Sequence, residues 1–409
     1  MVSVFVARFL GAESFGLLNY LLAIIALLTP LSSLGLNAII TRELVTKKQN
    51  EIVIMSTAVA FRLFGGICAA TILILALFFD VFTRLNAISW GVLLLAFANV
   101  FVAFHVIDFW FQAKVQSKYV VKMRLVSVVF ISVSKLLLVY FEASFSLFIW
   151  VCAVESLFVS LGFIAIYFRR KARLKWKSVN WQYGLTLLKQ SKWLILSGLA
   201  SVIYLKIDQV MLTEMVSAKE NGVYAVASRI SEVWYFFPIA LVASFFPSLL
   251  KSKEVNYEQY QRKLQRLCDF LFFGALLIAI LISFISDHLI IFLYGEEYAG
   301  AGVILALHIW AGIFVFMRAL LSKWLLAEEL VFFSLVTHGV GAIINVTLNI
   351  WLIPLYQGQG AAIATVISYA FASYIVLFFH SSTWPMAKVM TKSLFPPSRI
   401  ILSKVKSSA

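Results

Sequence analysis

Long, uninterrupted apolar runs are the feature that most restricts what this chain of 409 residues can fold into. Many of the runs reach the roughly 20 residues that a helix needs to cross a bilayer. None shows the alternation of polar and apolar residues that is typical of membrane β-barrel strands. The chain is 62% hydrophobic and only 13% charged, whereas a soluble domain is about 25% charged. We therefore predict an all-α, polytopic membrane protein.

The predicted spans follow from the limits of these runs. They cover residues 17–40, 53–79, 88–112, 119–140, 145–168, 185–212, 222–250, 266–293, 301–326, 331–354 and 360–380. Residues 1–10, MVSVFVARFL, resemble the end of one more helix. Ten residues rise about 15 Å, which is half of a hydrocarbon core, and this stretch lacks the basic leader and cleavage site of a signal peptide. We expect a truncated first helix. Either the start codon lies further upstream, which we favour, or the protein carries a damaged first span.

Basic residues are concentrated on every second connector between the predicted spans and on the C-terminal tail. The other connectors hold only Arg84 and Lys219. This alternating bias is the positive-inside signature, and it predicts that the basic connectors and the C-terminus are cytoplasmic. The net charge of +15 is then explained by orientation and by contact with anionic membrane lipids, so we expect no nucleic-acid partner.

The most basic connector, RRKARLKWKSVNWQYG (169–184), divides the chain near its middle. It predicts an N-terminal transmembrane bundle over 1–168, a cytoplasmic linker over 169–184 and a C-terminal bundle over 185–380. The remaining 381–409 would form a cytoplasmic or interfacial tail, because its end is too short and too basic to span. The stretches ESFGLLNY (13–20) and KENGVYAV (219–226) each open a span, which indicates a parallel internal repeat.

Several basic residues lie at membrane depth, where a charge costs at least about 2.5–3.5 kcal/mol. Arg62 is about ten residues into its span, with no acidic residue within one helical turn, and Lys135 has no acidic residue on its own helix. Each therefore needs a partner from another helix, or water. A water-filled cavity that binds an anionic substrate would supply both.

Lys206 and Asp208 stand out in the stretch GLASVIYLKIDQVML (198–212). Residues two apart point to opposite sides of a helix, so these two cannot pair directly. Lys192 and Lys206 are fourteen residues apart and share one face, about 21 Å apart in height, and Lys189 precedes Lys192 by one turn. This predicts a basic stripe along the helix, although lysines near either end of a span can also extend to the lipid headgroups.

Acidic residues at membrane depth are fewer and have competing interpretations. Glu155 is either the ion-pair partner of one of the buried bases or a proton site. Arg229 and Glu232, three residues apart, can neutralise one another. Asp108 and His105 form a polar pair near the cytoplasmic face, which we interpret as packing. The interior of the predicted spans remains net basic.

No motif for metal or cofactor chemistry is present. The three cysteines are far apart and lie within apolar runs, which indicates packing, and the five histidines form no metal-binding spacing. Neither a zinc site, a disulfide nor a phosphate-binding glycine loop is expected.

Five ordered stretches resemble the Wzx-type flippases of O antigen and other polysaccharides. They are ARFLGAESFGLLNYLLAIIALLTPLSSLGLNAIITREL (7–44), IDFWFQAKVQSKY (107–119), DQVML…NGVYAVASRI (208–230), LYGEEYAGAGVILAL (293–307) and INVTLNIWLIPLYQGQGAAIATVISYA (344–370). The resemblance extends over essentially the whole chain. It implies the MATE-like fold of the multidrug/oligosaccharidyl-lipid/polysaccharide exporter superfamily, with two six-helix bundles.

The resemblance also implies a function in the bacterial inner membrane. Undecaprenyl-pyrophosphate carrying one oligosaccharide repeat unit would pass from the cytoplasmic to the periplasmic leaflet by alternating access, as a step of lipopolysaccharide or related polysaccharide biosynthesis. A polymerase and other assembly proteins would be partners. Cationic side chains would bind the pyrophosphate, and acidic ones would pair charges or couple an ion gradient. The expected binding residues are Arg8, Arg62, Lys135, Lys206, Arg229 and Arg318, and the expected acidic residues are Asp208, Glu155, Glu232 and Asp108.

Three alternative functions compete with this one. A multidrug antiporter of the same superfamily should have an acidic cavity for cations, which the basic interior disfavours. A lipid II flippase would also require a basic cavity, but the ordered stretches fit it less well. An integral-membrane polysaccharide polymerase or acyltransferase should carry its chemistry on a large external loop, and the non-cytoplasmic connectors are short. We therefore expect a transporter and no enzyme.

Overall fold

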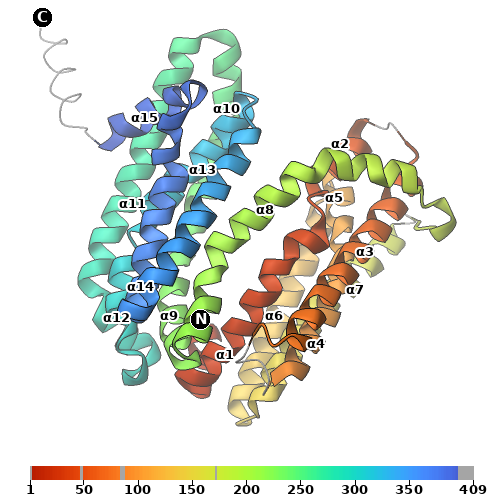
Figure 1. Ribbon diagram of the computed structural model, residues 1–409. Helices are drawn as coiled ribbons and strands as arrows, with labels where there is room; N and C mark the ends of the chain where they lie inside the picture. The colour runs from red at the N-terminus through yellow and green to blue at the C-terminus, as the bar shows by residue number, and fades with distance from the viewer. Residues whose placement is uncertain (1, 47–48, 83–87, 171–172, 395–409) are drawn as a thin grey trace, which may run out of the picture. The chain divides into compact units, whose positions relative to one another are not determined.

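The computed structural model describes residues 2–46, 49–82, 88–170 and 173–394, and over these ranges every regular element is a helix (Figure 1). Arg84, part of the predicted linker and residues 395–409 of the predicted tail lie outside the described residues. Within them, ten helical stretches are long and apolar enough to cross a membrane. The predicted all-α, polytopic membrane protein is confirmed.

The helices are numbered in chain order. They are α1 (Val2–Ser33), α2 (Asn37–Thr46), α3 (Glu51–Phe78), α4 (Ser89–Val100), α5 (Val106–Ala113), α6 (Lys118–Tyr140), α7 (Phe145–Arg169), α8 (Trp181–Met215), α9 (Ala218–Glu232), α10 (Phe236–Val255), α11 (Tyr257–Tyr294), α12 (Ala301–His308), α13 (Ala311–Ala327), α14 (Phe332–Ser373) and α15 (Trp384–Leu394). Short 3₁₀ segments lie between them: η2 (Phe101–His105), η3 (Trp176–Ser178), η4 (Val233–Tyr235), η5 (Glu296–Tyr298), η6 (Ile375–Phe379) and η7 (Ser381–Thr383).

Each predicted span has a counterpart among these helices. The last two predicted spans fall within the single stretch Phe332–Phe379. Gln357, at φ 51° and ψ −127°, interrupts this stretch between them. The N-terminal segment Val2–Leu10 is helical and is set off from the rest of α1 by Gly11 at φ 72° and ψ 168°. Only glycine adopts this backbone conformation without strain.

Asparagine side chains cap the N-termini of three of the long helices. Asn50, Asn180 and Asn256 cap α3, α8 and α11, each accepting a hydrogen bond from a backbone N–H of the first turn. Such a cap satisfies one of the four N–H groups that a helix start leaves unbonded. All three caps lie on the end of the helices where the basic connectors lie, which we call the basic end.

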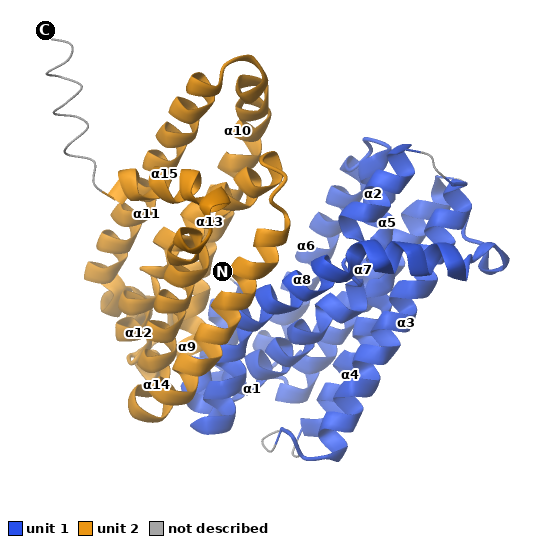
Figure 2. Ribbon diagram, turned by 45° about the horizontal axis from the view of Figure 1, so that its top comes forward, with its two compact units in different colours: residues 1–222 blue, residues 223–409 orange. Residues whose placement is uncertain are grey.

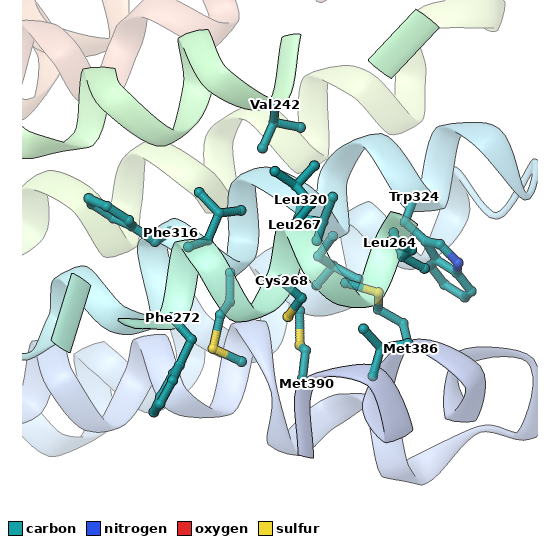
Figure 3. Packing of buried hydrophobic residues seen from close by; sticks show 14 of the residues in the cluster. Val242, Leu264, Leu267, Cys268, Phe272, Phe316, Leu320, Trp324, Met386 and Met390 are labelled. Atoms are coloured by element: carbon teal, nitrogen blue, oxygen red, sulfur yellow. The ribbon is translucent and has the colours of Figure 1, made fainter. Parts of the chain in front are cut away.

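The chain forms two compact units, residues 1–222 and 223–409 (Figure 2). The core of the second unit packs α10, α11 and α13 together with α15 (Figure 3). Leu267 and Cys268 of α11 lie at its centre, and Met386 and Met390 close it from α15. The first part of the predicted tail is therefore packed into a hydrophobic core. The division into bundles at the basic linker stays a prediction.

Large apolar side chains also cover the outside of the helices. Phe284 and Phe292 of α11 and Trp351 of α14 are 84%, 77% and 71% exposed. A water-soluble protein rarely exposes large contiguous apolar patches. The surface of these helices is suited to contact with lipid.

Candidate functional site: charged residues in the membrane-spanning helices

Arg62 is buried where two helices of the first unit are interrupted. Its guanidinium donates to Asn37 Oδ1 at the start of α2 (3.3 Å) and to the Val102 carbonyl in η2 (3.4 Å). The residue is 3% exposed, and no carboxylate of the described residues forms an ion pair with it. The change from α4 to a 3₁₀ segment leaves carbonyls without their usual helical partners. Arg62 thus meets its polar neighbours through neutral oxygen atoms.

Arg318 repeats this arrangement in the second unit. It lies on α13, is 8% exposed and donates to the Ala372 carbonyl (3.2 Å). Ala372 is in the last turn of α14, where the chain passes into η6. The carbonyls at the end of a helix carry partial negative charge, so a cation is favourable there. Both buried arginines thus lie within a helix and donate to groups at the ends or breaks of neighbouring helices.

Lys135 and Glu155 pair across two neighbouring helices. Lys135 Nζ of α6 lies 3.3 Å from Glu155 Oε2 of α7, and the two side chains are 24% and 45% exposed. One of the two interpretations of Glu155, a partner for a buried base, has the geometry it requires. The pair neutralises both charges within the first unit.

Asp108 is paired with a base rather than with His105. It accepts from Arg124 Nη2 of α6 at 2.7 Å and from Gln112 at 3.0 Å. The His105 ring instead packs edge-on against Phe163, with ring centroids 5.3 Å apart. The expected polar pair is thus replaced by an ion pair between α5 and α6, because Arg124 reaches Asp108 from a neighbouring helix.

Lys206 and Asp208 lie on α8, which runs without interruption from Trp181 to Met215. Asp208 is 3% exposed and Lys206 is half-buried, whereas Lys189 and Lys192 are exposed. At 100° per residue the three lysines fall within about 100° of one another and extend over about 26 Å of helix. We call Lys189, Lys192 and Lys206 the α8 lysine stripe. The structure supplies the single continuous helix on which its predicted geometry depends, and the stripe itself stays a prediction.

The remaining predicted residues lie near helix breaks. Arg8 is exposed on the short segment before Gly11, and Arg229 and Glu232 are half-buried in the last turn of α9. The expected binding residues are divided between the units: Arg8, Arg62, Lys135 and Lys206 are in the first, and Arg229 and Arg318 are in the second.

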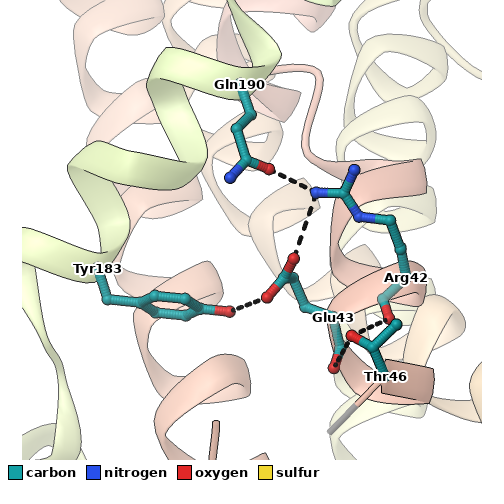
Figure 4. Close-up of polar contacts among 5 residues, drawn as sticks. All are labelled: Arg42, Glu43, Thr46, Tyr183 and Gln190. Atoms are coloured by element: carbon teal, nitrogen blue, oxygen red, sulfur yellow. Dashed lines mark hydrogen bonds and ion pairs between the residues drawn. The ribbon is translucent and has the colours of Figure 1, made fainter. Parts of the chain in front are cut away.

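Sequence reasoning missed a polar cluster at the basic end of the first unit (Figure 4). Glu43 of α2 is 3% exposed and accepts from the Tyr183 hydroxyl of α8 (3.1 Å) and from Arg42 (3.2 Å). Arg42 also donates to Gln190 of α8 (2.5 Å). Figure 4 shows both α8 side chains reaching toward α2. A signal was available, since Glu43 is acidic among basic neighbours on a predicted cytoplasmic connector.

A buried network of neutral polar groups in the second unit was also missed. Asn349 donates to Asn345 Oδ1 (3.1 Å), and Asn345 donates to Ser368 (3.4 Å), all within α14. The Tyr224 hydroxyl of α9 lies 3.4 Å from that of Thr365. Asparagines four residues apart in an apolar run mark one helix face, and that spacing was the signal.

The two repeat stretches meet at their glycines. A Cβ added to Gly16 would lie 1.8 Å from the Ala218 carbonyl oxygen, and one added to Gly222 would lie 1.9 Å from that of Ala12. The two contacts are reciprocal: Gly16 lies against the carbonyl of Ala218, four residues before Gly222, and Gly222 lies against the carbonyl of Ala12, four residues before Gly16. Asn221 closes the contact by donating to the Gly16 carbonyl (2.9 Å). The reciprocal geometry supports the internal repeat.

Comparison with known proteins identifies the family. The profile of the family described as polysaccharide biosynthesis protein matches residues 1–253. The chain belongs to this family. Over 189 residues it is also 29% identical to the probable flippase AglR of Haloferax volcanii, a match that covers 44% of this chain and 39% of that protein. The matched part is thus well under half of the curated relative's length.

Solved structures show the same fold over nearly the whole chain of this family member. An inward-facing multidrug resistance MATE family transporter of the MOP superfamily superposes with a TM-score of 0.76 and 12% identity, over 97% of this chain and 94% of that one. The lipid II flippase MurJ gives 0.71 and 17%, over 98% and 90%. The predicted polysaccharide-family resemblance and MATE-like fold are confirmed. Identities this low carry no information on substrate.

Proposed function

We propose that this protein is a flippase that moves undecaprenyl-pyrophosphate-linked oligosaccharide repeat units from the cytoplasmic to the periplasmic leaflet of the bacterial inner membrane. Membership of the polysaccharide biosynthesis family supports a role in handling such saccharides. The observation that carries the proposal is the α8 lysine stripe, three cations on one face of an uninterrupted membrane helix. Transport proceeds by alternating access, and the basic end and the C-terminus face the cytoplasm.

The stripe suits a pyrophosphate because its charges are graded in exposure. Lys189 and Lys192 are exposed near the basic end, and Lys206 is half-buried about 21 Å further along. A lysine ammonium binds phosphate oxygens through charge-assisted hydrogen bonds, which are about twice as strong as neutral ones. In this proposal the exposed lysines receive the pyrophosphate and Lys206 holds it at depth.

The other predicted residues take different parts. In the first unit, Arg8 is proposed to bind the pyrophosphate or acidic sugars, as Lys206 does, and Asp208 to position a base or couple an ion gradient. In the second unit, Arg229 and Glu232 are proposed to take the same two roles. Lys135 is proposed to exchange Glu155 for substrate, since the pair is partly exposed. Arg62 and Arg318 are buried against backbone carbonyls and would reach substrate only after a change at those helix ends.

The fold alone does not distinguish this function from its alternatives. Multidrug transport and lipid II flipping occur on the same fold. Cationic drugs would be repelled by the lysine stripe, which favours an anionic substrate. A polymerase and other assembly proteins would then use the product on the periplasmic face.

The decisive experiment measures on which face lipid-linked repeat units accumulate in cells lacking the protein. Cytoplasmic accumulation, relieved by the wild-type gene, supports the flippase. Lys206→Gln should slow flipping by at least about tenfold, the loss of one charge-assisted hydrogen bond, and Lys206→Arg should restore part of the rate. Lys177→Gln, at an exposed lysine outside the stripe, is the matched control. Units that reach the periplasmic face and remain unpolymerised there would refute the flippase and favour a polymerase.

A further inference from the structure

A groove of about 350 Å³ lies between α10 and α11 of the second unit. Its walls are apolar: Leu241, Phe245 and Leu249 come from α10, and Leu267 and Phe270 come from α11. Phe245 and Phe270 remain 51% and 55% exposed. The volume falls in the range of about 300–1,000 Å³ that is typical of small-ligand sites. The groove has room for an apolar chain.

Two cations lie on this groove, and no acidic residue of the described chain forms an ion pair with either. Lys263 Nζ donates to Ser252 Oγ (2.7 Å) and Ser248 Oγ (3.1 Å), both hydroxyls of α10. Arg266 follows one turn later on α11 and also lines the groove. The site therefore combines two uncompensated positive charges with an apolar wall.

The carboxylates nearby are bound elsewhere. Glu258 pairs with Arg262 (2.9 Å), and Glu328 pairs with Lys253 (2.8 Å). Asp269 accepts from Gln265 (2.8 Å) and from Ser393 of α15 (2.7 Å). An anionic ligand at Lys263 and Arg266 would thus meet cations that no neighbouring carboxylate neutralises.

The position along α11 matches the depth of a lipid headgroup. The helix has 38 residues, so it is about 57 Å long and exceeds the roughly 30 Å hydrocarbon core. Its continuous apolar run begins one turn after Arg266, at Phe270, and contains no charged residue before Asp287. Lys263 and Arg266 therefore lie at the interface on the basic end, and the apolar walls lie on the hydrocarbon side.

We propose that this groove binds an anionic glycerophospholipid, with its phosphate between Lys263 and Arg266 and one acyl chain against Phe245 and Phe270. A soluble phosphate would leave the apolar wall uncovered, and a zwitterionic lipid would bring an ammonium group toward the two cations. Cationic clusters at the membrane interface recognise anionic headgroups in this way. The site is independent of the proposed flippase activity.

The test compares lipid binding to the purified full-length protein by native mass spectrometry and by thermal shift. Phosphatidylglycerol and phosphatidylcholine with identical acyl chains are titrated in turn. Wild-type protein should bind phosphatidylglycerol at least about fivefold more tightly. The double variant K263Q/R266Q should lose this preference. The double variant K251Q/R262Q removes the same charge at the same end of the helices but outside the groove, and it should keep the preference.

Further arms separate the possible ligands. Phe270→Ala should weaken binding of long-chain phosphatidylglycerol more than that of the dihexanoyl form, and glycerol phosphate should give no thermal shift. Equal binding of the two lipids, or equal loss in both double variants, would overturn the proposal. Displacement of phosphatidylglycerol by an equimolar amount of undecaprenyl phosphate would also overturn it, because the groove would then belong to the carrier lipid. Each variant is compared with its own melting temperature in phosphatidylcholine, which corrects for any loss of stability.

Discussion

Replacing Gly222 by alanine should destabilise the protein through a single, well-defined clash. The new Cβ would lie 1.9 Å from the Ala12 carbonyl oxygen. An ordinary van der Waals contact requires more than about 3.4 Å, so the two backbones must separate by about 1.5 Å. Overpacking of this kind costs about 1–3 kcal/mol. Because backbone lies on both sides of the contact, no flexible side chain can move aside to relieve it.

The reciprocal contact makes a stronger prediction for the double variant. Gly16→Ala creates the equivalent clash with the Ala218 carbonyl, at 1.8 Å. One separation of the same two segments relieves both clashes, so the cost of the double variant should be well below the sum of the single costs. The melting temperatures of the two single variants and the double variant, measured in one detergent, give this coupling.

A control variant tests whether the effect is specific to the contact. Gly274 of α11 has no atom within 4 Å of an added Cβ, so Gly274→Ala should leave the melting temperature unchanged or raise it, since alanine favours the helix. Additive costs for Gly16→Ala and Gly222→Ala, or a stability equal to that of wild type, would refute the reasoning.

Three further predictions concern the polar contacts. Arg62→Met should lower unfolding stability by about 1–3 kcal/mol, because Asn37 and the Val102 carbonyl lose a donor; an unchanged melting temperature with lost flipping would instead place the guanidinium on substrate. Reversing the pair, as Lys135→Glu with Glu155→Lys, should recover most of the stability lost in either single reversal, with a coupling of about 0.2–1 kcal/mol for so exposed a pair; no recovery in the melting temperature would contradict the ion pair. Tyr183→Phe should lower the stability by about 1 kcal/mol, because the hydrogen bond to Glu43 is lost. If the double variant Glu43→Gln/Tyr183→Phe is no less stable than Glu43→Gln alone, the two residues act together.

The helices could be predicted closely because their signal is local. The predicted span 301–326 corresponds to Ala301–Ala327, and 145–168 corresponds to Phe145–Arg169. Length and apolarity are sufficient for this, since the bilayer imposes both. The α8 lysine stripe was equally accessible, because its three residues share one helix.

Partners from different helices could not be predicted, because the sequence does not state which helices are neighbours. Arg62 donates to a carbonyl forty residues away, in the 3₁₀ segment FVAFH. This segment contains neither proline nor glycine, so its sequence does not indicate a break in the helix. Glu155 was recognised as a possible partner for a base, but its pairing with Lys135 required the packing of α6 on α7. His105 and Asp108 were wrongly paired for the same reason, since Arg124 comes from another helix.

The burial of Arg62 against neutral oxygens has an electrical consequence. No carboxylate of the described residues cancels its charge by an ion pair, so α3 carries a fixed positive charge within the membrane. Moving one elementary charge across the full field changes its electrostatic energy by about 2.3 kcal/mol per 100 mV. At 100 mV, a step that carries Arg62 through a quarter of the field would therefore change the energy by about 0.6 kcal/mol. A membrane potential that is negative inside would draw this arginine toward the cytoplasm and bias any such movement of α3.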